Sequence, residues 1–193
     1  MAEFGVIAAL LKIIDRLIQL KAGRIQSRKE NFRDIFQATY EDLTQIHGDY
    51  IDMFESLRVY SANEPNINAA DAAAKVNRAK KELRARRTAF AHIRTKVKTL
   101  VAQLEAEDWP PEERAFINTV ARYFPNGEPA VPQSAATSVL RYLESDLEPA
   151  EIDLLIGETI QAHNNAWSDV TRAFGTLRIA ISKLGSPPRG GDH

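Results

Sequence analysis

Apolar residues recur every seven positions in three long segments of this 193-residue chain, and none of these segments contains proline. The segments run over 32–60, 76–104 and 156–184, so they have equal length, roughly 43 Å each at the helical rise per residue. A sustained seven-residue repeat is typical of helices packed side by side, and no segment shows the apolar and polar alternation of a strand. The sequence therefore predicts an all-α fold.

Prolines and polar loops set the ends of the expected helices. Three long helices are predicted at about 4–60, 69–107 and 149–184, with two short helices at about 111–123 and 134–144. Because the loop after the first long helix is short, the first two long helices should be antiparallel neighbours. We expect an elongated antiparallel helical bundle of three long helices plus two short helices.

The path of the two short helices is open in the sequence. In the favoured interpretation they form a hairpin at one end of the bundle, where they cover the N-terminal part of the first helix and leave the last helix parallel to the first. Alternatively they run end to end as a broken fourth helix, which makes the last helix antiparallel to the first. The expected organisation is an apolar and then basic extension of the first helix at 1–31, the helical bundle at 32–184 and a disordered tail at 185–193.

Composition limits the classes of function. The chain has no cysteine, 25 Lys and Arg against 26 Asp and Glu, and a formal net charge of −1. Thiol nucleophiles and cysteine-bound metals are thereby excluded, and a uniformly basic nucleic-acid binder is disfavoured. Because no known catalytic or metal-binding motif occurs, we expect no enzyme activity, no cofactor and no metal. With no segment suited to span a membrane and no signal peptide expected, the predicted location is the cytoplasm or the surface of a membrane.

The N-terminal segment is the first candidate for function. It is mostly apolar from Phe4 to Leu20 and basic over 21–29, a pattern typical of a helix that binds anionic lipid. Three interpretations stay open, which are packing within the chain, self-association and contact with a membrane. The candidate interaction or membrane residues are Phe4, Ile7, Leu10, Leu11, Ile14, Leu17 and Ile18.

A basic run is the second candidate. Residues 75–98 hold ten Lys or Arg and a single acid, Glu82, which is typical of a phosphate-binding stripe. The acidic stretch at 34–57 favours instead a charge-complementary pair of helices, with Asp42 near Lys96. The candidate polyanion-binding residues are Arg84, Arg87, Arg94 and Lys98.

Polar side chains occupy two positions of the apolar repeats. Alignment of the first two long helices brings Tyr50 opposite Arg86, so we predict that the phenol stacks on or hydrogen-bonds the guanidinium. His163 lies in the repeat of the last helix beside Trp167, and we predict a buried histidine with a local hydrogen bond.

Together these features favour a non-enzymatic interaction or scaffold module that self-associates through its apolar N-terminal helix. The expected partner is another protein or a second copy of the chain. A peripheral membrane or membrane-perturbing effector that acts through residues 4–29 at an anionic membrane surface is the alternative. Binding of nucleic acid or another polyanion through the basic helix at 75–98 is a further alternative.

Overall fold

The structure is a computed structural model that describes residues 3–21, 27–61, 69–105, 108–123 and 131–184. Within these residues the regular elements are all helical, which confirms the all-α prediction. The elements are α1 (Glu3–Lys21), α2 (Arg28–Asn31), the π-helix η1 (Phe32–Gln37), α3 (Ala38–Ser61), α4 (Ala69–Glu105), α5 (Pro111–Tyr123), α6 (Val131–Leu143) and α7 (Pro149–Lys183). The structure does not describe the side chains of the candidate residues Phe4, Ile7, Arg94 and Lys98. The predicted tail at 185–193 also lies outside the described residues.

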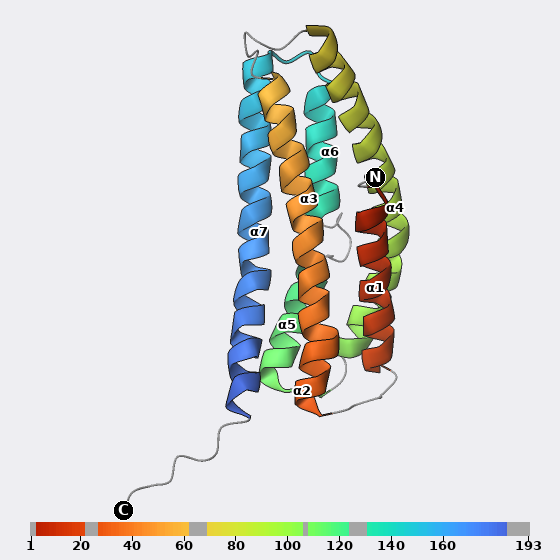
Figure 1. The fold of residues 1–193 in the computed structure, drawn as a ribbon, viewed down its shortest axis with the longest axis vertical. Coiled ribbons are helices and arrows are strands. Elements are labelled where there is room, and N and C mark those ends of the chain that lie inside the picture. The colour runs from red at the N-terminus through yellow and green to blue at the C-terminus, as the bar shows by residue number, and fades with distance from the viewer. Residues whose placement is uncertain (1–2, 22–26, 62–68, 106–107, 124–130, 185–193) are drawn as a thin grey trace, which may run out of the picture.

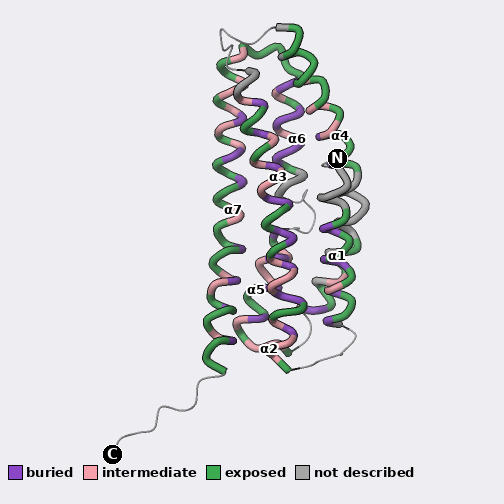
Figure 2. Tube along the Cα trace, viewed as in Figure 1, coloured by how far each residue is buried: buried purple, intermediate pink, exposed green. Residues whose placement is uncertain are grey.

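The long helices lie lengthwise beside one another (Figure 1). From the lower end of the view, α3 runs up, whereas α4 and α7 run down, so α7 is antiparallel to α3. Helix α3 packs against α7, and α5 and α6 each pack against both α4 and α7. Buried residues line the inner sides of these helices and exposed residues the outer sides (Figure 2).

The expected hairpin of the two short helices is wrong. Helix α5 occupies the lower half of the molecule and α6 the upper half, and both run upward between α4 and α7 (Figure 1). The reason is that each short helix has its own apolar face to bury. Phe116 and Val120 of α5 and Val139 and Leu140 of α6 are all at most 3% exposed. Two apolar faces placed end to end cover twice the length of α7 that a hairpin would cover.

The expected continuous helix from residue 4 to 60 is also wrong. Helix α1 ends at Lys21, and the chain enters α2 through Ser27, whose hydroxyl accepts a hydrogen bond from the backbone of Glu30 while the Glu30 carboxylate accepts from the backbone of Ser27. This capping box fixes a helix start inside the segment predicted to be helical throughout. The sequence signal was present, as a serine followed three residues later by a glutamate.

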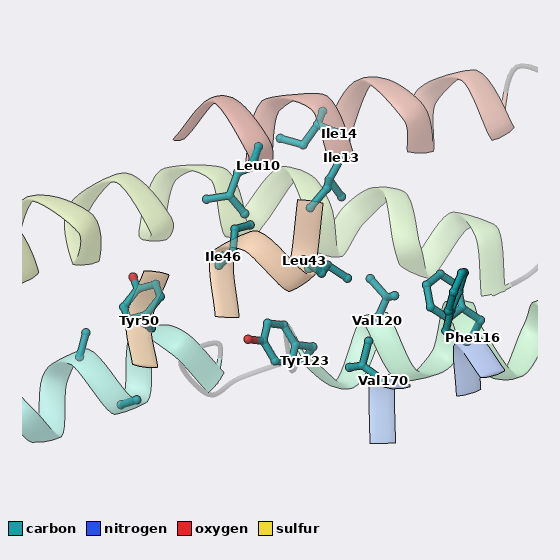
Figure 3. Close-up of a cluster of buried hydrophobic side chains, with 14 of the residues drawn as sticks. Leu10, Ile13, Ile14, Leu43, Ile46, Tyr50, Phe116, Val120, Tyr123 and Val170 are labelled. Atoms are coloured by element: carbon teal, nitrogen blue, oxygen red, sulfur yellow. The ribbon is translucent and has the colours of Figure 1, made fainter. Parts of the chain in front are cut away.

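Helix α1 folds back and packs against α3 and α4 (Figure 1). Its apolar residues converge with side chains of α3, α5 and α7 (Figure 3). A continuous helix would have carried this face beyond the rest of the protein and into water, where a contiguous apolar surface is unfavourable. The buried members of α1 are Ala9, Leu10, Ile13, Ile14, Leu17 and Leu20, each at most 5% exposed.

Charged contacts hold α1 and α2 in place. Arg16 of α1 donates to the carboxylate of Asp42 and, at 2.8 Å, to the backbone carbonyl of Ala38, both in α3. Arg28 at the start of α2 donates to the buried carboxylate of Glu113 in α5 over 2.9 Å. The lower end of the molecule is therefore closed by contacts between segments that are far apart in the sequence.

Substitutions in α1 test this docking. We expect Leu10→Ala to lower the free energy of unfolding by about 2–5 kcal/mol, because it removes a side chain that is 0% exposed and leaves a cavity. Its neighbour Leu11 is 48% exposed, so Leu11→Ala should change stability by no more than about 0.5 kcal/mol. Urea unfolding followed by circular dichroism measures both. Equal effects of the two substitutions would contradict the packing of α1 described here.

Candidate functional site

A continuous stack of aromatic rings runs along the contact between α3 and α7. Successive rings come alternately from the η1–α3 segment and from α7, and every successive pair is stacked, with interplanar angles of 4° to 21°. The order is Phe32, Phe174, Tyr40, Trp167, His47 and His163, with centroid separations of 5.6, 4.0, 5.6, 4.9 and 4.6 Å. This column stabilises the α3–α7 contact, since each inner ring packs against a ring on both of its faces.

The π-helix brings Phe32 into this column. Tyr40 and His47 are seven residues apart, the spacing that keeps two side chains on one face of a packed helix. Phe32 precedes Tyr40 by eight residues, one too many for an uninterrupted α-helix. The π-turn of η1 accommodates one extra residue, so Phe32 takes the position that an α-helix would give to residue 33. A seven-residue repeat that includes Phe32 continues to Thr39 and not to Tyr40, so the repeat alone does not predict this contact.

The inner end of the column is a pair of histidines. His163 is 1% exposed, as predicted, but neither of its ring nitrogens has a hydrogen-bond partner within the described part of the chain, so the predicted local hydrogen bond is not found. The Nε2 atom of His47 lies 3.0 Å from Oδ1 of Asn164. Burial lowers the pKa of His163 to about 3 and also lowers the pKa of His47. Both rings are therefore neutral near pH 7.

Tyr50 links this histidine pair to α4. The Arg86 guanidinium carbon lies 5.2 Å from the centroid of the Tyr50 ring, which confirms the predicted stacking of this pair. The Arg86 side chain is only 3% exposed and forms an ion pair with Glu82 one turn earlier. On its other side the Tyr50 ring lies 6.0 Å from the ring of His163. Burial raises the pKa of Tyr50, so its phenol stays protonated.

We name the residues His47, Tyr50, Arg86, Tyr123 and His163 the central polar layer. They come from α3, α4, α5 and α7 and meet where α5 ends, at Tyr123. Each of them is at most 9% exposed. Within the described residues, both ring nitrogens of His163 and the Nε and Nη1 atoms of Arg86 have no hydrogen-bond partner, so burial of this layer carries a cost in desolvation. No group of three or more His, Asp or Glu suited to hold a metal ion occurs within the residues that the structure describes.

The N-terminal candidates divide between the two sides of α1. Leu10, Ile14 and Leu17 are at most 5% exposed, so they are used in packing within the chain. Leu11 and Ile18 are each 48% exposed and face outward. Across the described ranges, no helix is both long enough and apolar enough to cross a membrane.

The basic candidates stay at the surface. Arg84 and Arg87 are exposed, and Arg84 forms an ion pair with Glu144 after α6. The predicted pair of Asp42 with Lys96 is wrong, because Asp42 pairs with Arg16 of α1 instead. The ion pair of Arg58 with Asp153 likewise joins α3 to α7 rather than to α4. Sequence reasoning missed these partners because it aligned α3 with α4 alone and left α1 out of that contact.

The buried histidines predict a loss of stability in mild acid. Their pKa values are lowered on folding, whereas histidine in an unfolded chain titrates near 6.5, so between about pH 6.5 and 3 only the unfolded chain binds the proton at His163. The contribution of the neutral His163 to the free energy of unfolding is complete above pH 6.5 and falls by about 1.4 kcal/mol per pH unit below it. Urea unfolding at pH 7, 6 and 5 should show that the free energy of unfolding depends less steeply on pH in His163→Phe than in the natural chain. Identical slopes would contradict the burial of a neutral imidazole.

The geometry thus gives one buried polar layer and two exposed surfaces, the outer side of α1 and the basic side of α4. Comparison of the chain with protein-family models, with curated proteins and with solved structures gave no match.

Proposed function

We propose that the protein is a non-enzymatic helical interaction module, built as an elongated antiparallel bundle, that binds a polyanion through α4. The observation that carries the proposal is a row of exposed bases, each three residues after the last, along the outward half of α4. We name this row the basic face. It consists of Arg78, Lys81, Arg84 and Arg87.

Within the part of the chain that the structure describes, few carboxylates oppose the basic face. The ion pair described for it joins Arg84 to Glu144, and both of these side chains remain well exposed, at 59% and 43%. Glu82, the acid within this part of α4, is held by the buried Arg86. An exposed pair of this kind contributes little free energy and is readily exchanged for another anion.

The position of α1 supports the same proposal. The acids of α3 were expected to neutralise α4, but Asp42 pairs with Arg16 of α1 and Glu55 pairs with Arg58 of its own helix. A row of closely spaced Lys and Arg without matched acids attracts phosphate groups, and the counterions released on binding make the affinity depend on salt.

Fluorescence anisotropy with a labelled double-stranded DNA of mixed sequence tests the proposal. We expect binding that weakens steeply as salt rises, and at least tenfold weaker binding in the variant Arg78→Glu/Lys81→Glu/Arg87→Glu. The slope of log affinity against log salt should fall by about 0.9 for each phosphate contact that the variant loses.

A matched variant distinguishes loss of binding at the basic face from a general effect of net charge. Arg122→Glu/Arg178→Glu/Lys183→Glu makes the same change in net charge at exposed positions of α5 and α7. It should retain most of the affinity, because these residues lie outside the basic face. Equal losses in both triple variants, or an affinity that does not change with salt, would refute a polyanion site on α4.

A further inference from the structure

We propose that the outer side of α1 pairs antiparallel with α1 of a second copy of this chain, an interaction independent of the polyanion binding proposed for α4. The outer side of α1 consists of the residues that the fold leaves exposed after α1 has docked. They are Ala8, Leu11, Lys12, Asp15, Ile18 and Gln19.

Two apolar side chains on this surface face the same way. Leu11 and Ile18 are each 48% exposed and lie seven residues apart, so they occupy one side of the helix two turns from each other. The other exposed large apolar residues of the described chain are Leu147, Leu154, Ile179 and Leu184, and no two of these lie seven residues apart within one helix. The outer side of α1 therefore has two large apolar groups within reach of a single partner helix.

The charges between these two residues complement a copy of themselves. Lys12 and Asp15 are exposed and have no ion pair within the described part of the chain, whereas the neighbouring Arg16 is already engaged by Asp42. In an antiparallel pair of α1 helices, Lys12 comes level with Asp15 of the second copy, and Asp15 with Lys12. A two-fold axis forms this contact twice, as the symmetry of a closed dimer requires.

Nearly the same two-fold axis brings the apolar residues together. The axis that places Leu11 beside Ile18 of the second copy lies one residue, or about 1.5 Å along the helix, from the axis that pairs Lys12 with Asp15. A parallel arrangement would instead set Lys12 against Lys12 and Asp15 against Asp15. Charge complementarity therefore favours the antiparallel dimer over the parallel one.

The contact is small. A patch on one side of one helix falls below the ~1,000 Å² of total buried surface that marks most stable interfaces, so the dimer should form and dissociate readily with concentration. Light scattering of the full chain over a series of concentrations should show the mass rise from 21.6 kDa toward twice that value. A chain that stays at the monomer mass at the highest concentration would overturn the proposal.

Charge reversal tests the register. Lys12→Asp sets the new carboxylate against that of Asp15 in the second copy and should shift dimer formation to at least tenfold higher concentration. The double reversal Lys12→Asp/Asp15→Lys restores opposite charges and should restore the dimer. If the single and double variants behave alike, the antiparallel register is wrong. Circular dichroism checks that each variant keeps its helical content, which is expected because both residues are exposed.

Substitution of the exposed apolar residues identifies what binds the outer side of α1. Leu11→Gln/Ile18→Gln should abolish the dimer, whereas Leu154→Gln on α7 removes an even more exposed leucine, at 63%, and should leave the dimer intact. Flotation with phosphatidylserine vesicles tests lipid as the occupant instead. A chain that is monomeric, floats with these vesicles and stops floating in Leu11→Gln/Ile18→Gln would overturn the proposal in favour of a membrane surface. DNA binding by these α1 variants should be unchanged, so failure of the dimer does not bear on the basic face.

Discussion

Burial of the apolar side of α1 against α3 and α4 is the contact on which the rest of the arrangement depends. Several aliphatic side chains leave water there, each worth about 1.5–3 kcal/mol when fully buried. The same contact pairs Arg16 with Asp42, the acid that the sequence predicted beside Lys96 of α4. Docking of α1 therefore determines which apolar residues of this helix remain at the surface and which partner Asp42 takes.

The central polar layer has a different role from the apolar contacts around it. Aliphatic side chains stabilise a packed set of helices through burial alone, whereas Tyr50 and Arg86 meet as an aromatic ring and a cation. The histidine pair makes stability depend on protonation, because burial lowers the pKa of both rings and folding therefore favours their neutral forms. The centre of the fold is thus sensitive to pH, whereas apolar burial stabilises the helices along their length.

The helical class and the partnership of Tyr50 with Arg86 could be predicted from the sequence, because both follow from a repeat that is local to each helix. The division of the predicted first helix into α1 and α2 could not be inferred from that repeat, since the residues of both helices favour helix. The path of α5 and α6 was decided by where their apolar faces find partners, which is a property of the whole assembly. The exposed state of Leu11 and the buried state of Leu10 likewise depend on a docking direction that a periodic pattern does not specify.

The π-turn of η1 has a consequence for how this chain can vary in length. The π-turn absorbs one extra residue, so Phe32, eight residues before Tyr40, still faces Phe174. Deletion of one residue between Phe32 and Ala38 would place Phe32 seven residues before Tyr40 in an ordinary α-helix and so keep it on the same side. Insertion of one more residue would instead rotate Phe32, and the chain before it, by about 100° relative to Tyr40. This short segment therefore tolerates the loss of one residue more readily than the gain of one.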